Sequence, residues 1–336
     1  MMKNVVFIFF IQLLIFGCKI PNKDDAKGIN ILLLTVDDLS YNSVGVYGSE
    51  VDNITPNIDQ LASEGVRFNH AYVNYSICNP SRSSILTGLY GHNHGSLVEN
   101  GIREEVKPIT SFLKEKGYYT GIMHKEFHYL PMESFSWDSV MGTEVLQGSR
   151  IPSVFKEHAA GFMKKARSEG KPFILVANTA DPHRPFATRD LNKYPGGDGE
   201  PFDYPRLYDT TEVENPPFLP YHNVFHQDAA LYYTSVKRAD AMVGAALEAL
   251  EESGQAKNTL IIFLSDNGRA FPFAKHDCYM ESNRTPLIIK FPDRYNPLVD
   301  DEHMVSSVDI YPTVLDILNF DKGDIQTFDG RSFKSL

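Results

Sequence analysis

The sequence predicts an α/β fold in which a large mixed, mostly parallel sheet is sandwiched between helices. Three observations support this: continuous apolar runs of strand length, helical patterns between those runs, and a composition that is 42% hydrophobic over 336 residues. Continuous apolar runs are typical of strands that are covered on both faces, whereas half-exposed strands alternate apolar and polar residues. The length and composition predict one large domain or two small ones with an ample core.

The expected strands and helices alternate along the chain. Four apolar runs end abruptly in polar residues: INILLLTV (29–36), YYTGIM (118–123), PFILVANT (172–179) and TLIIFLS (259–265). The expected helices cover residues 56–65, 109–116, 154–168 and 228–253. The last of them is amphipathic, because its apolar residues recur every three or four positions, and Gly254 follows it as a stop signal.

The N-terminus predicts an export signal over residues 1–18. One lysine precedes an apolar run, Val5–Phe16, that is too short to span a bilayer. A Gly-Cys pair after such a run resembles a bacterial lipoprotein cleavage site, with Cys18 as the lipidated first mature residue. The bulky phenylalanine before that pair leaves plain secretion as the alternative. We therefore expect a linker over 19–28, a folded domain over 29–336, and a periplasmic or outer-membrane-anchored location in a bacterium.

The charge balance excludes one class of function. The formal net charge is −11, which argues against a protein that binds nucleic acid through its overall field. An anionic substrate would have to be held by positive charge that is local to a pocket.

The stretch ICNPSRSSILTG (77–88) predicts a short helix that begins at a cysteine. A proline suits its first turn, and a glycine can end it. Cys78 would then lie where free backbone N–H groups and the helix dipole attract an anion, and Arg82, one turn later, can direct its guanidinium at the same anion. A disulfide between Cys78 and Cys278 is the alternative, which we do not expect because Cys78 has this better use.

Polar clusters follow all four predicted strands, and ligands bind such sheets at the carboxyl ends of the strands. Asp37 and Asp38 follow the first run, and Asp266 and Asn267 follow the last. Oxygen donors of this kind are the set that Ca²⁺ or Mg²⁺ selects. Either pair alone would be interpreted as a turn or a helix cap.

Groups that carry protons and positive charge belong to the same set: Lys125, His128, His183 and Lys275. A lone histidine is more often structural than catalytic, but two histidines and two lysines would here flank a metal and an anion site. Together these residues predict a metal-assisted attack on a tetrahedral oxyanion ester, a phosphate or a sulfate.

At this point the residues resemble a known family. CNPSRSSILTG looks like the signature of the type I, formylglycine-dependent sulfatases, C-x-P-S-R-x-x-x-L-T-G. Further blocks resemble family landmarks in the family order: TVDDLSYNSVGVYG, TPNIDQLASEGVRFNHAY, TGLYGHNHG, YYTGIMHKEFH, LSDNG and PLIIKFP. The resemblance implies the alkaline phosphatase-like sulfatase fold and a sulfatase catalytic domain over 29–336.

The resemblance also implies a chemistry for Cys78. A formylglycine-generating enzyme or an anaerobic sulfatase-maturing enzyme would oxidise it to formylglycine, an aldehyde whose hydrate carries two hydroxyls on one carbon. One hydroxyl attacks sulfur, and loss of the proton from the other lets sulfate leave as the aldehyde re-forms. A serine or an unmodified thiol cannot release sulfate in this way.

Site roles carry over by position. The implied calcium ligands, with Mg²⁺ as the other possible ion, are Asp37, Asp38, the Cys78 derivative, Asp266 and Asn267. The implied catalytic groups are Arg82, which steadies the hydrate; Lys125 and Lys275, which hold sulfate oxygens; His128, with His124 as its rival, which takes a proton; and His183 or Lys275, which protonates the leaving group.

The segment TADPHRPF is similar to the D-P-H-R of the heparan N-sulfatases, the sulfamidase subgroup. Arg184 would then bind an acidic or sulfated group of the sugar, unless it only caps a surface loop. We expect hydrolysis of the N-sulfate of glucosamine in heparin or heparan sulfate fragments. The alternatives are a 2-O- or 6-O-sulfatase of glycosaminoglycans, because PHRPF also resembles the iduronate-sulfatase branch, and a phosphatase or phosphonate hydrolase on the same scaffold.

The C-terminus gives a further expectation. Family members usually continue into a small subdomain, whereas this chain ends at DGRSFKSL, about where that subdomain would begin. We expect the subdomain to be largely absent, and an inactive truncated fragment is the non-enzymatic alternative.

Overall fold

The computed structural model describes residues 28–98, 100–195, 197–199, 205–292, 297–321, 325 and 327–335. The predicted signal peptide, with Cys18, and the predicted linker up to residue 27 lie outside these residues. None of the described helices combines the length and apolar character that a membrane span requires.

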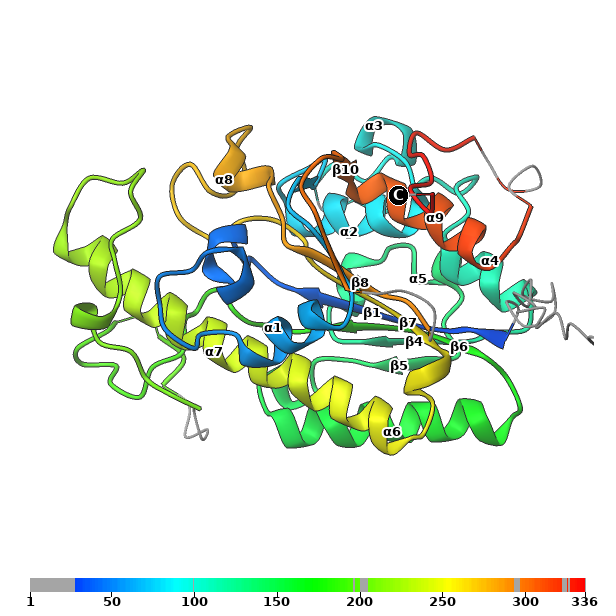
Figure 1. Ribbon diagram of the computed structural model, residues 1–336, viewed down its shortest axis with the longest axis horizontal. Helices are drawn as coiled ribbons and strands as arrows, with labels where there is room; N and C mark the ends of the chain where they lie inside the picture. Colours follow the sequence, from blue (N-terminus) through cyan, green and yellow to red (C-terminus); the bar gives the residue numbers. More distant parts are fainter. Residues whose placement is uncertain are drawn as a thin grey trace, which may run out of the picture.

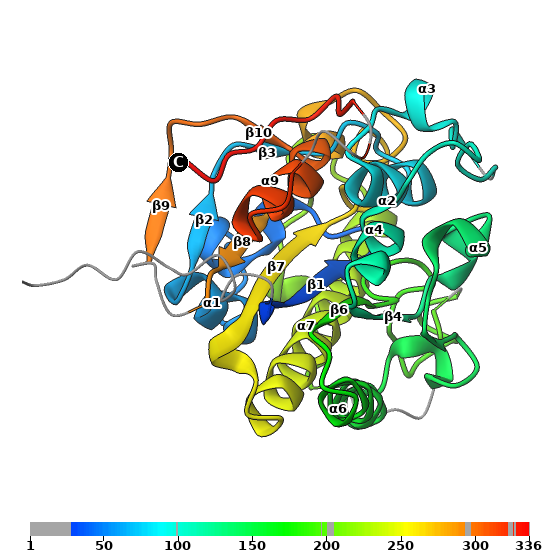
Figure 2. The ribbon, with the colours of Figure 1, turned by 90° about the vertical axis from the view of Figure 1, so that its right-hand side faces the viewer.

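The described part of the chain contains a large sheet with eight strands in the order β5-β4-β6-β1-β7-β8-β2-β9 (Figures 1 and 2). Its strands are β1 (Asn30–Val36), β2 (Val66–Phe68), β4 (Tyr119–Met123), β5 (Ser139–Met141), β6 (Phe173–Asn178), β7 (Thr259–Ser265), β8 (Leu287–Lys290) and β9 (Leu298–Asp300). β8 is antiparallel to both of its neighbours, and the other pairings are parallel. A short parallel pair, β3 (Ala71–Tyr72) with β10 (Val305–Ser306), lies outside this sheet. The mixed, mostly parallel sheet predicted from the sequence is confirmed.

Helices cover both faces of the sheet (Figures 1 and 2). The described helices are α1 (Pro56–Ser63), α2 (Cys78–Thr87), α3 (Gly91–His94), α4 (Ile109–Glu115), α5 (Met132–Phe135), α6 (Pro152–Ser168), α7 (Asn223–Glu252), α8 (Met280–Asn283) and α9 (Ile310–Ile317), of which α3 and α8 are single turns outside the two cores. Leu32 and Leu34 of β1 pack with α1, α6 and α7, whereas Ile31 and Leu33 pack with α2, α4 and α9. Successive strand residues point to opposite faces, so one apolar run supplies both cores.

The predicted helices are present, with shifted boundaries. The longest, α7, begins at Asn223 rather than at residue 228, and α6 begins at Pro152 rather than at residue 154. The first turn of α7 lacks apolar periodicity, and it is held by the imidazole of His222, whose Nδ1 accepts a hydrogen bond from Val224 N at 3.2 Å. A proline at the first position starts α6.

The cysteine-led helix is confirmed as α2, whose first residue is Cys78. All ten of its residues are buried. Gly88 ends it in a left-handed conformation with φ of 66°, and its N–H donates to the carbonyl of Ser84 at 2.9 Å. Cys78 and Cys278 are both free thiols, so the structure shows no disulfide between them.

Candidate active site

Strand order brings the four polar clusters together. The four predicted strands are neighbours in the sheet, in the order β4-β6-β1-β7, and they are parallel. Their carboxyl ends therefore meet at one edge. Val36 pairs with Ser265 in the register, so the next residues, Asp37 and Asp266, emerge side by side.

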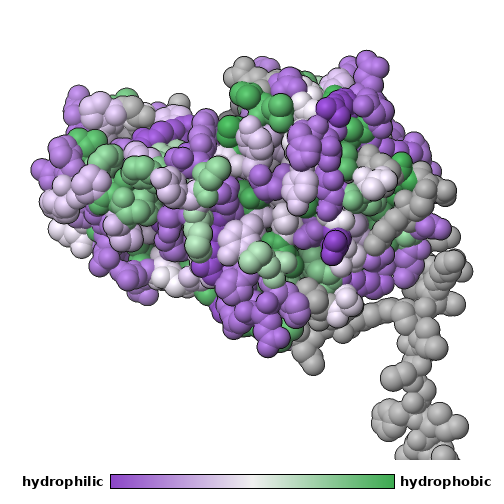
Figure 3. All heavy atoms as spheres, turned by 90° about the horizontal axis from the view of Figure 1, so that it is seen from above, coloured by the Kyte–Doolittle hydropathy of each residue, from purple (hydrophilic) through white to green (hydrophobic). Residues whose placement is uncertain are grey.

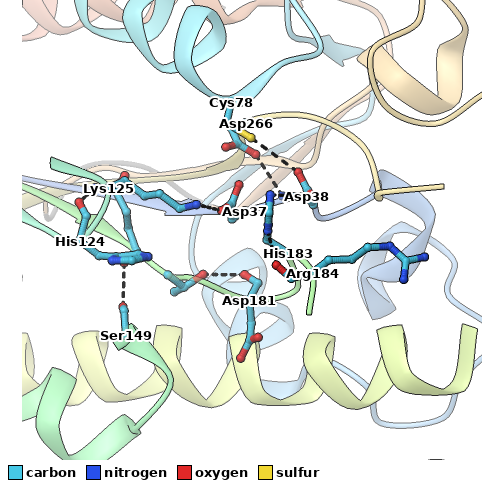
Figure 4. A network of polar contacts seen from close by, with 12 residues as sticks. Asp37, Asp38, Cys78, His124, Lys125, Ser149, Asp181, His183, Arg184 and Asp266 are labelled. Atoms are coloured by element: carbon cyan, nitrogen blue, oxygen red, sulfur yellow. Dashed lines mark hydrogen bonds and ion pairs between the residues drawn. The ribbon is translucent and has the colours of Figure 1, made fainter. Parts of the chain in front are cut away.

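The oxygen donors form one wholly buried cluster (Figure 4). The backbone N–H of Asp38 donates to Asp266 Oδ1 at 3.1 Å, and Asn267 Nδ2 donates to Asp38 Oδ1 at 2.7 Å. Asp37, Asp38, Asp266 and Asn267 are each 0% exposed. The predicted metal-ligand set is thus brought together in space.

Cys78 lies directly against this cluster. Its Sγ is 3.9 Å from Asp38 Oδ1 and 3.3 Å from the Nζ of Lys275. One ligand atom each from Asp37, Cys78 and Asp266 lie within 4.8 Å of one another, and the same holds for Asp38, Cys78 and His183. The start of α2 and the ends of β1 and β7 therefore enclose one site.

The residues present fit a hard divalent cation. Asp38 Oδ2 and Asn267 Oδ1 are buried and have no hydrogen-bond partner among the described residues. Buried acceptors without donors are costly unless a cation or another group satisfies them. Burial raises the pKa of Asp266 to about 7 despite the attraction of Arg82, and repulsion from Asp37 and Asp38 adds to the rise. A divalent cation would favour the ionised form of all three carboxylates.

Two cationic side chains hold Asp37. Arg82 is wholly buried, with Nη2 at 2.7 Å from Asp266 Oδ2 and 3.6 Å from Asp37 Oδ1. The ammonium of Lys125 forms an ion pair with Asp37 Oδ2. Burial alone would raise the pKa of Asp37, but Lys125 and Arg82 outweigh it and hold that pKa well below its usual value.

The thiol of Cys78 is not set up as a thiolate nucleophile. Burial raises its pKa well above the ordinary value, and the nearby charges of Asp37, Asp266 and Asp38 raise it further. Only the thiolate attacks effectively. This electrostatic setting disfavours a metal-free cysteine phosphatase.

His128 lines a pocket of about 500 Å³ that Cys78 also lines. Burial, followed by repulsion from Arg82 and Lys125, lowers the pKa of His128 to about 2. The imidazole is therefore neutral at physiological pH and able to accept a proton. The rival, His124, is 5% exposed, and its Nδ1 lies 3.1 Å from the hydroxyl of Thr143. The choice of His128 stays a prediction, and the pocket favours it.

Two side chains of the DPHR segment (residues 181–184) lie in different places relative to the cluster. His183 Nε2 lies 3.9 Å from Asp38 Oδ2, at the side of the cluster. The guanidinium of Arg184 points away from Cys78 in Figure 4 and binds Asp228 Oδ2 at 2.6 Å instead. Its predicted contact with substrate stays a prediction, and the structure does not bring Arg184 into the cluster.

Asn178, the last residue of β6, was not predicted as a site residue, and it lies wholly buried behind the site. Its Oδ1 accepts hydrogen bonds from Arg82 Nη1, the hydroxyl of Thr35 and, at 3.3 Å, that of Tyr129. Its Nδ2 donates to the carbonyls of Met123 and His124 at 2.9 and 3.0 Å. One amide therefore fixes both Arg82 and the backbone that leads to Lys125. The available signal was a polar side chain inside an apolar strand, opposite Thr35 in the register.

A structural role for Asp181 near His183 was also not predicted. Asp181 is wholly buried and forms ion pairs with Arg238 of α7 and with Arg150, whose Nε is 3.2 Å from Asp181 Oδ1. Asp181 comes two residues before His183, so these contacts anchor the turn that carries the imidazole.

Known proteins resemble this chain over most of its length. A family model described as Sulfatase matches residues 29–320. The chain is 32% identical over 315 residues to the N-sulphoglucosamine sulphohydrolase of Homo sapiens, which covers 87% of this chain and 61% of the relative. It is 29% identical over 339 residues to the iduronate 2-sulfatase of Mus musculus, which covers 80% of this chain and 60% of the relative. The chain thus spans about three fifths of the length of these curated relatives.

Solved structures share the fold. The crystal structure of Ps i-CgsB in complex with k-i-k-neocarrahexaose superposes with a TM-score of 0.68 and 25% identity, covering 90% of this chain and 75% of that one. The family model spans β1 through α9, and its match includes Cys78 and the oxygen-donor cluster of Asp37, Asp38, Asp266 and Asn267. The chain therefore belongs to the Sulfatase family.

Proposed function

We propose that this protein hydrolyses sulfate from a sulfated glycan, with formylglycine made from Cys78 and one Ca²⁺ at the cluster. The observation that carries the proposal is the position of Cys78, at the start of a buried helix, between the carboxylate cluster and a pocket. Formylglycine, when hydrated, would supply the hydroxyl that attacks sulfur. Ca²⁺ held by the four oxygen-donor residues and residue 78 would supply the positive charge that lowers the pKa of a bound hydroxyl.

The surrounding side chains have separate tasks. Lys125 and Lys275 carry ammonium groups at the cluster, where they would hold sulfate oxygens as negative charge develops. Burial would lower the pKa of Lys275, but Asp38 and its other anionic neighbours raise it well above its usual value. Lys275 therefore retains its proton. This favours His183, whose side chain is 37% exposed, as the group that protonates the departing nitrogen or oxygen. Neutral His128 would accept the proton of the second hydroxyl.

For the substrate we propose the N-sulfate of glucosamine in heparin or heparan sulfate fragments. The identity to a curated N-sulphoglucosamine sulphohydrolase and the DPHR segment support this choice. The similarity to an iduronate 2-sulfatase supports a 2-O-sulfatase as the second candidate.

The test measures sulfate released by purified, matured protein from three matched disaccharides that carry one N-, 2-O- or 6-O-sulfate each. We expect kcat/KM for the N-sulfated substrate to exceed the others by at least about 100-fold. The two kinds of sulfate have different leaving groups, an amine nitrogen or an alcohol oxygen, and the general acid must protonate each in its own position. Preference for an O-sulfate would transfer the assignment to that branch. Release of phosphate from a phosphate ester in place of sulfate would overturn the proposal.

A change at Asn178 should affect turnover more than substrate binding. In Asn178→Asp, a carboxylate oxygen replaces the amide nitrogen that donates to two carbonyls, so the loop of Lys125 loses its support. We expect kcat to fall by at least about 100-fold with KM changed less, as for the misplacement of catalytic groups. Tyr129→Phe removes a single donor to the same oxygen and is the matched control, expected to lose less than about tenfold. Equal losses in the two variants would contradict the role given to Asn178.

We also propose export through residues 1–18, lipidation at Cys18, and maturation by a formylglycine-generating or anaerobic sulfatase-maturing enzyme. The motif around Cys78 and the Gly-Cys pair support these steps. Metabolic labelling with a radioactive fatty acid tests the anchor: label lost on Cys18→Ala supports it, and label retained contradicts it.

A further inference from the structure

The pocket beside Cys78 has a wall that the proposed chemistry does not use. Cys78 and His128 form the reactive part of its lining, and Phe127, Val98 and His276 also line it. None of the described lining residues is acidic, so an anionic sugar meets no like charge there.

Phe127 is the aromatic part of this wall. It lies between Lys125 and His128 in a short 3₁₀ helix, Glu126–His128, and is 49% exposed. Its ring meets that of His128 edge to face at 4.6 Å between centroids, and the Nζ of Lys125 lies 5.7 Å from its centroid. The ring thus contacts two residues of the proposed catalytic machinery, while about half of the residue remains exposed.

Phe127 is not the only exposed aromatic residue of the described chain, since Phe273 and Tyr279 are also exposed, but neither of these two lines the pocket of Cys78 and His128. On the face shown in Figure 3, hydrophobic residues gather in small groups between hydrophilic ones. An exposed phenylalanine that is also fixed in orientation, at a pocket with reactive groups, is a feature of ligand sites, because sites are lined by aromatic side chains with a few polar groups.

We propose that Phe127 is the stacking platform for the sugar ring that bears the scissile sulfate. This inference rests on the proposed function and names the residue that recognises the sugar rather than the sulfate. A pyranose presents a face of C–H groups that packs on an aromatic ring, while its hydroxyls remain available to polar lining groups such as His276. With the sugar on Phe127, its sulfate would project toward Cys78, which lines the same pocket.

The experiment compares Phe127→Ala with the wild-type protein on the N-sulfated disaccharide, and uses inorganic sulfate as a competitive inhibitor. We expect KM to rise about 5- to 10-fold, the size of one lost aromatic contact, with kcat changed less than about twofold. The inhibition constant of inorganic sulfate should stay the same, because sulfate has no ring to stack. Phe127→Trp should restore KM. Val98→Ala, which removes an exposed side chain without a ring from the same pocket, should change KM less than about twofold.

The outcomes are distinct. An unchanged KM in Phe127→Ala, with an active wild-type protein, overturns the platform and leaves the proposed function intact. A parallel rise in the inhibition constant of sulfate would mean that Phe127 only supports His128 and Lys125, which also overturns it. If the wild-type protein released no sulfate from any sulfated sugar, the proposed function and the platform would both fall.

Discussion

Cys78→Ala is expected to lower kcat/KM for sulfate release by at least about 10⁴-fold, because it removes the atom on which the attacking group is built. The fold should survive, since the change is small and α2 is held by the burial of all ten of its residues. Circular dichroism and the thermal midpoint check this. Mass spectrometry of the wild-type peptide should show residue 78 with its sulfur lost and an oxygen gained.

The chain supplies its own control for that prediction. Cys278, the other described cysteine, is exposed and lies outside the cluster, so Cys278→Ala should retain full activity. An active Cys78→Ala variant, or an active wild-type protein with an unmodified thiol at residue 78, would rule out the sulfatase chemistry proposed for this site.

Asp266→Asn should abolish the response of the protein to Ca²⁺ together with at least about 10³-fold of its turnover. One charged ligand is lost from a site in which Asp37, Asp38 and Asn267 supply the remaining side-chain oxygens. The readout that does not depend on activity is thermal unfolding. Ca²⁺ should raise the midpoint of the wild-type protein, because it binds the folded state alone, and should leave that of Asp266→Asn unchanged.

The matched control is Asp138→Asn, which makes the same chemical change at a carboxylate outside the cluster. Asp138 Oδ1 forms an ion pair with Lys114 Nζ at 2.8 Å. The control variant should keep the rise in midpoint. A variant Asp266→Asn that still responds to Ca²⁺ would show that this aspartate is not a ligand. A wild-type midpoint that does not respond to Ca²⁺ or Mg²⁺ would argue against a metal at this position.

Much of the site could be predicted because it depends on strand order. Asp37 and Asp266 follow apolar runs, and parallel strands deliver their ends to one edge, so local sequence was enough to expect their proximity. The position of Cys78 followed from helix-start chemistry in the same way.

The parts that could not be predicted depend on side-chain partners that are distant in the sequence. The guanidinium of Arg184 is turned by Asp228, which lies 44 positions away on α7. Asn178 acquires its role through the register with β1 and through Arg82, 96 positions earlier. Residue type and periodicity carry no information about such pairings, which are decided when the helices pack on the sheet.

If Cys78 is matured as proposed, the burial of α2 has a consequence for when that maturation can take place. Every residue of this helix is enclosed, and Cys78 itself is only 7% exposed, so a second enzyme has no access to the surrounding main chain once the sheet and its helices have assembled. Under the proposed maturation, oxidation must therefore occur on the extended polypeptide during or soon after synthesis, and molecules that fold first will remain permanently inactive.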